Sequence, residues 1–329
     1  MPSLTVQGAR VFDHFVWSVV VCPLLVAVAV RLLADRLRPD RAVTFSVVSI
    51  GVAAAACLVN LAAFATKAVA EQHPVAVWLG FSDARVRADT AYVPWVSWLS
   101  AALLVSAFAG LALVWRAHRR DTVFAGRYAT MPASEDRVVM LDDVRAEAFA
   151  VPVGAGRIVV TTGMRAALDD RQYAALLAHE RAHLAARHHR LVRFARLSAA
   201  AHPLFWWLAH RMEYLVERAA DERAAAELGD RRVVAKAISA AALVSAGSVS
   251  GSALGMAGSG RRSVLWMAPT GSDLRRGGVV PRRVASLVAP PQAASALLIA
   301  VPVVLAFSSV VWTGECVWDL GELLHAAGL

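Results

Sequence analysis

The chain has 329 residues, 58% of them hydrophobic, and a mean hydropathy of +0.52. This composition is too apolar for an ordinary soluble protein and indicates a membrane protein with several spans and one domain. The net charge of +9 comes almost wholly from arginine, and basic and aromatic residues are not interleaved, so we expect no direct nucleic-acid binding.

Four long apolar runs predict transmembrane helices, at about residues 15–34, 42–66, 92–115 and 293–312. Arginines cluster after the first and third runs and before the fourth, which predicts cytoplasmic ends there and external termini. A signal peptide is the alternative for the first run, but Arg10 is the only arginine or lysine before it. The expected fold is an α-helical membrane protein of about four spans with an inserted α+β, zincin-like metallopeptidase domain.

The runs divide the chain into four parts. Residues 1–115 hold three spans, and 116–244 form a domain on the cytoplasmic side. Residues 245–285, rich in Gly, Ser and Arg, are expected to be a linker, and 286–329 hold the fourth span and a short tail.

Three short β-rich segments, 137–141, 146–152 and 157–162, predict a small sheet in the domain. Ala148-Phe149-Ala150 is a candidate edge strand that pairs with an extended substrate, and a plain core strand is the alternative. A further apolar run, 197–209, is too short to cross a bilayer and is expected at the membrane interface or in the domain core.

A metal-binding pattern lies in a helix that Asp169 or Asp170 can cap. His179 and His183, four residues apart, leave one helix face about one turn apart and can share a metal ion. Glu180 has the place that the H-E-x-x-H pattern gives to a general base, which takes a proton from the attacking water.

A second helix, around residues 216–222, carries Glu217 and Asp221 on one face. Glu217 is the expected third ligand, because catalytic Zn²⁺ typically has three protein ligands and an open position. Asp221 can accept the other ring N–H of a ligand histidine.

Several further polar side chains surround the pattern. His188 and His189 are expected at the surface. Four others could donate a hydrogen bond to an oxyanion, and the sequence does not choose among them: His202, His210, Arg218 and Arg223.

Residues 157–164, 174–183, 202–207 and 217–221 together resemble the integral-membrane zinc peptidases of the BlaR/MecR type, and more distantly the HtpX and CAAX-prenyl-protease types. The resemblance implies Zn²⁺ bound by His179, His183 and Glu217, with Glu180 as catalytic base and Asp221 as the orienting carboxylate. It also implies a protein or peptide substrate, with a transcriptional repressor as one expected example.

We therefore predict a multi-pass protein of the bacterial cell membrane that cleaves proteins at the cytoplasmic membrane face as a zinc-dependent endopeptidase, in a regulatory role. An HtpX-like protease for membrane-protein quality control is one alternative. A second alternative is a non-proteolytic signalling or scaffold protein in which the zinc site only stabilises the domain. Structural zinc sites usually have four ligands, however, and this pattern offers three.

Overall fold

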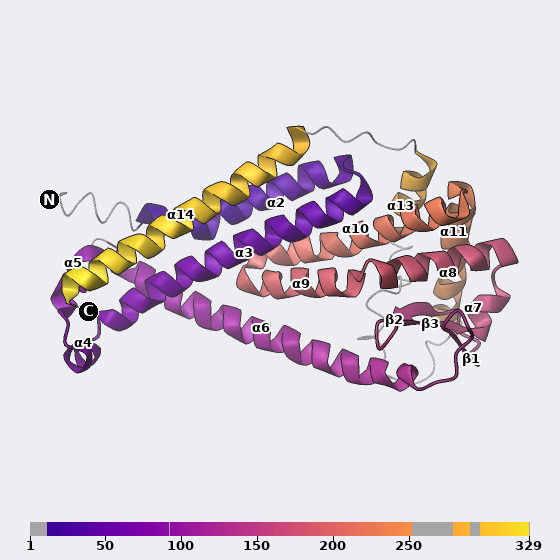
Figure 1. Cartoon of the computed structure of the whole chain (residues 1–329), viewed down its shortest axis with the longest axis horizontal. Helices are drawn as coiled ribbons and strands as arrows, with labels where there is room; N and C mark the ends of the chain where they lie inside the picture. Colours follow the sequence, from indigo (N-terminus) through magenta and orange to yellow (C-terminus); the bar gives the residue numbers. More distant parts are fainter. Residues whose placement is uncertain (1–11, 92, 252–278, 290–296, 329) are drawn as a thin grey trace.

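The structure is a computed structural model that describes residues 12–91, 93–251, 279–289 and 297–328 (Figure 1). Most of these residues are helical. Three helical segments are long and apolar enough to cross a membrane: Phe12–Arg36, Pro39–Ala70 and Pro94–Ala129. The first two contain the first two predicted runs, and the third begins two residues after the start of the third predicted run.

The first segment contains a π-helical turn, η1 (Trp17–Val21), then α2 (Cys22–Leu33) and a 3-10 turn, η2 (Ala34–Arg36). The second is α3 (Pro39–Ala70) and the third is α6 (Pro94–Ala129). A proline stands in the first turn of α3 and of α6, where its missing N–H is no loss. The short helices α4 (His73–Leu79) and α5 (Asp83–Thr90) connect these two long helices.

The third apolar segment has no break where the domain was expected to begin. Helix α6 continues through residue 116 to Ala129, so one rod joins the apolar run to the domain. Residues such as Ala and Arg favour helix, and nothing helix-breaking intervenes before Gly126. One continuous helix therefore joins the third apolar segment to the domain.

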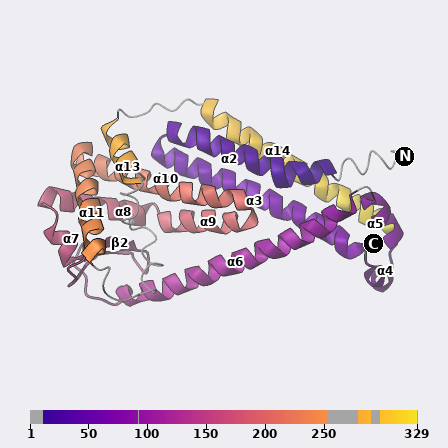
Figure 2. The ribbon, with the colours of Figure 1, turned by 180° about the vertical axis from the view of Figure 1, so that it is seen from behind.

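The last helix, α14 (Leu297–Ala327), contains most of the fourth predicted run, whose first residues lie outside the described ones. It lies along α2 and α3 in both views of the molecule (Figures 1 and 2). Two polar contacts join it to them, Cys22 Sγ to Ser309 Oγ at 2.6 Å and Asn60 Nδ2 to Thr313 Oγ1 at 2.9 Å. Whether α14 crosses a membrane stays a prediction.

A helical hairpin fills the space between α3 and α6, which approach each other at one end and diverge at the other (Figure 1). It consists of α9 (His188–Ala201) and the first half of α10 (Pro203–Leu228). Glycines permit the close approach: a Cβ on Gly51 would lie 2.7 Å from the ring of Phe194, and one on Gly110 would lie 3.3 Å from Ala200 Cβ. The predicted run 197–209 is the tip of this hairpin.

The hairpin and the first two spans share one hydrophobic core. Its apolar side chains come from α2, α3, α9 and α10 and from the turn that joins α2 to α3, and they exclude water from the junction. The fully buried members with the largest side chains are Val30, Leu37, Ile50, Phe205, Leu208, Met212 and Leu215. The domain therefore packs directly on the first two apolar segments.

A three-stranded sheet with the order β1-β3-β2 lies at the far end of α6. The strands β1 (Val138–Leu141), β2 (Ala148–Val151) and β3 (Arg157–Thr161) confirm the three β-rich segments. β1 pairs with β3 in parallel, and β2 pairs with β3 antiparallel. β2 is thus an edge strand, as the sequence predicted.

The register of β2 shows which of its peptide groups are free. The N–H of Thr161 donates to the carbonyl of Glu147 at 3.0 Å, and Phe149 lies opposite Val159. Bonded pairs alternate along an antiparallel ladder, so the peptide groups of Ala148 and Ala150 point away from β3. This outward edge of β2 faces helix α8 (Asp170–Ala185).

Four helices complete the domain: α7 (Thr162–Ala166), α8 (Asp170–Ala185), α11 (Arg231–Gly251) and α13 (Val279–Val288). Asp169 caps α8 in a capping box with Gln172, which confirms the predicted helix start.

The predicted linker 245–285 is helical at both ends, in α11 and in α13, while residues 252–278 lie outside the described part. In α13 the apolar Val284 and Leu287 lie on the face that packs against α11 and α10, and this burial makes the segment part of the domain.

Candidate metal centre

Two helices bring the three predicted ligands together. α8 carries His179 and His183, whose Nε2 atoms lie 3.0 Å apart, and α10 carries Glu217. Each Nε2 lies 3.4 Å from an oxygen of the Glu217 carboxylate. All three ligand atoms lie within 4.8 Å of one another, and both histidines are buried. Two imidazoles and one carboxylate form a donor set that suits Zn²⁺ and leaves one position open.

Glu180 lies beside this cluster and is buried, with only 7% of its surface exposed. Burial raises the pKa of its carboxyl to about 7, although the neighbouring His179 lowers it in part. The N–H of Ala150, which points away from β3, donates a hydrogen bond to it. A carboxyl group with a pKa near 7 can both accept and return a proton at neutral pH.

Both ligand histidines have a partner for the ring nitrogen that faces away from the cluster. Nδ1 of His179 lies 2.9 Å from Asp221 Oδ1, as predicted for Asp221. Nδ1 of His183 lies 3.0 Å from His188 Nδ1. Partners of this kind fix the tautomer of a ligand histidine and its ring orientation.

The prediction that His188 lies at the surface is wrong, because only 2% of its surface is exposed. Arg187 has a positive φ of 53°, which ends α8 and turns the chain so that His188 begins α9 against His183. Burial lowers the pKa of His188 to about 4, so a neutral His188 can accept the Nδ1–H of His183. The lone pair of His183 Nε2 is then free for a metal.

The structure adds a residue that the sequence reasoning assigned to the linker. Arg283 of α13 is buried, and its guanidinium binds Asp221 through two hydrogen bonds of 2.6 and 2.7 Å. Its Nη1 also lies 2.9 Å from Glu217 Oε2. One cation therefore holds the third ligand and the orienting carboxylate together.

This guanidinium determines the ionisation of the buried acids. Burial alone would raise the pKa values of Glu217 and Asp221, but Arg283 holds both below their ordinary range. Burial opposes the charged form of His179 too, yet its contacts with Asp221 and Glu217 raise its pKa to about 10. The carboxylates are thus ionised as ligand and partner, as metal binding requires.

The four oxyanion candidates are engaged elsewhere, and no contact among the described residues joins them to the ligand cluster. His202 caps α10, where its Nδ1 accepts from the N–H of Leu204, and His210 Nδ1 lies 2.7 Å from the carbonyl of Trp206. Arg218 donates to the carbonyl of Asp35, and Arg223 pairs with Asp40. Arg218 therefore connects α10 to the turn after α2, and Arg223 connects it to the first turn of α3.

We expect Asp221→Asn to weaken Zn²⁺ binding by about 10- to 100-fold, because His179 loses a charged partner for its Nδ1. Competition with a chromophoric chelator measures the affinity. Asp170→Asn on the exposed first turn of α8 is the matched control and should leave it unchanged. Equal affinities of the two variants would contradict the role of Asp221.

Comparison with known families gives one match: the model of peptidase family M48 fits residues 116–252. The match begins in α6 and ends after α11, so it includes all three ligand side chains but not Arg283. Comparisons with curated proteins and with solved structures give no match. Residues 116–252 are therefore similar to the metallopeptidases of family M48, and the cluster of His179, His183 and Glu217 lies within this part of the chain.

Proposed function

We propose that this chain is a membrane-bound, zinc-dependent endopeptidase. The observation that carries the proposal is the cluster of His179, His183 and Glu217 with Glu180 beside it. Bound there, Zn²⁺ would supply a Lewis acid that polarises the scissile carbonyl and lowers the pKa of a water molecule. Asp221 and His188 would hold the two imidazoles in place for it.

Glu180 would perform the proton transfers of peptide hydrolysis. Its carboxylate accepts a proton from the attacking water, and the carboxyl group then gives that proton to the leaving amine nitrogen. Its buried position beside the ligands supports this role.

The free edge of β2 would hold the substrate. An extended peptide can pair with the outward N–H of Ala148 and with the outward carbonyls of this edge, while the N–H of Ala150 already donates to Glu180. A peptide on this edge would therefore present its backbone to the catalytic carboxylate.

The proposed orientation follows from the arginines at the ends of the apolar runs, which favour a cytoplasmic domain, external termini and a fourth span in α14. The hairpin of α9 and α10 would then enter the inner leaflet from the domain side, between α3 and α6. Exposed Trp206 and Trp207 on α10 suit the interface of a bilayer.

Removal of the metal tests the activity. We expect the purified protein in detergent micelles to cleave unfolded β-casein, to lose this activity with a chelator, and to regain it with Zn²⁺. Gel electrophoresis follows the cleavage, and elemental analysis follows the zinc content. A chelator already saturated with Zn²⁺ is the control. Cleavage that continues in the zinc-free protein would rule the proposal out.

Two biological roles fit an endopeptidase here, repressor cleavage and quality control of membrane proteins. Mass spectrometry of cellular peptides can separate them, in cells that carry the wild-type chain or Glu180→Gln. A single repressor fragment that depends on wild type supports the regulatory role, and many membrane-protein fragments support quality control.

A further inference from the structure

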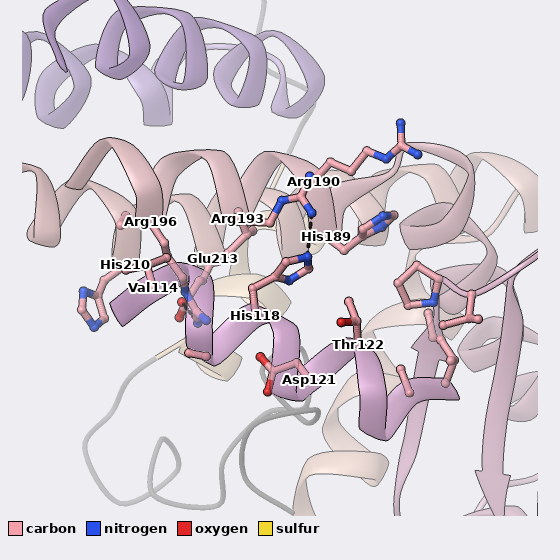
Figure 3. Close-up of a pocket in the computed structure, with 18 of the residues that line it drawn as sticks. Val114, His118, Asp121, Thr122, His189, Arg190, Arg193, Arg196, His210 and Glu213 are labelled. Carbon is pink, nitrogen blue, oxygen red and sulfur yellow. Dashed lines mark hydrogen bonds and ion pairs between the residues drawn. The ribbon is translucent and has the colours of Figure 1, made fainter. Parts of the chain in front are cut away.

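A cavity of about 530 Å³ lies between α6, α9, α10 and the end of β2 (Figure 3). Along α6 it extends from Val114 to Ala125, eleven residues apart, or about 16 Å of helix. It is also lined by Trp206 and His210 of α10 and by residues 150–153, the end of β2 and the two residues that follow it. The cavity thus reaches from the end of the third apolar run to the proposed substrate edge.

The cavity ends next to the catalytic carboxylate. Ala150, which lines it, is the residue whose N–H donates to Glu180. Pro152, which also lines it, has no N–H and limits the pairing of a peptide along this edge. A substrate on β2 would therefore direct neighbouring side chains into the cavity.

The charges in the cavity do not cancel. Three arginines of α9, Arg190, Arg193 and Arg196, face two acids, Asp121 and Glu213. Arg196 lies 2.6 Å from Glu213, and its charge also acts on Asp121. Positive charge is therefore left over on the part of α9 nearest to β2.

Arg190 and Arg193 carry this excess charge. Arg193 Nη1 donates to Nε2 of His118 at 2.7 Å, a contact with a neutral acceptor that leaves the arginine charge uncompensated. No ion pair among the described residues joins Arg190 or Arg193 to a carboxylate. A half-buried guanidinium without a counter-ion favours an anionic ligand, because pairing offsets its desolvation.

We propose that this cavity is a substrate subsite that accepts an acidic side chain near the cleaved bond, with Arg193 and Arg190 as the specificity-determining residues. The inference rests on the proposed peptidase function. An anionic lipid headgroup has the same charge, but the β2 backbone in the wall and its contact with Glu180 favour a peptide.

Peptides with single substitutions test the subsite. A peptide is taken from a cleavage site mapped in β-casein, and each position near the cleaved bond is changed in turn to Asp, Asn or Lys. For wild type we expect one position at which Asp raises kcat/KM about 10- to 100-fold over Asn. Arg193→Glu should invert this preference, so that Lys becomes the best residue there.

Two further variants make the test specific. Arg190→Glu changes an exposed residue, and it should reduce the same preference even if Arg193→Glu fails to fold. Arg119→Glu is the matched control, since it makes the same charge change on an exposed residue of α6 that does not line the cavity. This control should keep the wild-type preference.

Three results would overturn the proposal. The first is that wild type shows no acidic preference at any position. The second is that Arg193→Glu lowers kcat/KM equally for the Asp and the Asn peptides, and the third is that it lowers kcat/KM only in vesicles with phosphatidylglycerol. The last would assign the cavity to a lipid headgroup. If the zinc-loaded wild type cleaves no peptide at all, the proposed function itself fails, which is a distinguishable outcome.

Discussion

Replacement of Glu180 by Gln is expected to lower kcat for peptide cleavage by about 10²- to 10⁴-fold, the usual contribution of a general base. The amide keeps the size of the side chain but cannot take a proton from the attacking water. Because the three ligands are untouched, the variant should bind zinc as tightly as wild type. Cleavage of β-casein and elemental analysis of zinc measure the two properties.

The fold should tolerate this change. Burial already raises the pKa of Glu180 to about 7, so the site accommodates a neutral side chain at little cost. Glu227→Gln is the matched control, since this glutamate pairs with Arg181 in an exposed position at the end of α10. Wild-type activity in purified Glu180→Gln would refute its role as the base.

Replacement of Arg283 by Ala is expected to destabilise the protein by about 3–5 kcal/mol, because it leaves the buried carboxylates of Asp221 and Glu217 without their counter-charge. Thermal unfolding of the metal-free protein in detergent measures the loss. Added Zn²⁺ should recover part of it, since the ion supplies positive charge next to Glu217.

Two other variants separate charge from geometry. Arg283→Lys keeps the charge but loses the two-pronged contact with Asp221, so its unfolding temperature should fall between those of wild type and Arg283→Ala. Arg282→Ala removes the neighbouring, half-exposed arginine and should cost about 1 kcal/mol or less. Equal unfolding temperatures for Arg282→Ala and Arg283→Ala would contradict the assigned role of Arg283.

Local spacing was enough to predict much of the candidate site. His179, Glu180 and His183 lie within five residues of one helix, and Glu217 and Asp221 lie one turn apart on another. Helical periodicity fixes such relations without knowledge of the tertiary structure. The three strands were predictable for the same reason, since their alternation and the turns between them are local.

The other parts of the site depend on contacts between distant segments. His188 follows His183 by five residues, but only the left-handed conformation of Arg187 brings the two rings together. Arg283 was interpreted as one of the arginines that flank a span, and the residues around it give no sign of the two carboxylates that it binds. The apolar spacing of Val284 and Leu287 was an available signal that this segment forms a packed helix.

The hairpin of α9 and α10 was also not predicted from the sequence, because its apolar run was judged by length. A run of about 13 residues, 197–209, is too short to span a bilayer. Its length does not indicate whether it belongs to a pair of helices that packs between other helices. Gly51 and Gly110 on the facing helices mark the close contacts, but a glycine alone does not reveal its partner.

The contact of Arg283 with Asp221 joins two residues that are synthesised at different times. Arg283 stands 62 residues after Asp221 in the chain, and a ribosome adds about 5–20 residues per second, so the arginine is made about 3 to 12 seconds later. Until then the two carboxylates have no guanidinium to hold them beside the histidines. A nascent chain thus completes its candidate metal site only after Arg283 has been synthesised, later than the helices α8 and α10 that carry the cluster.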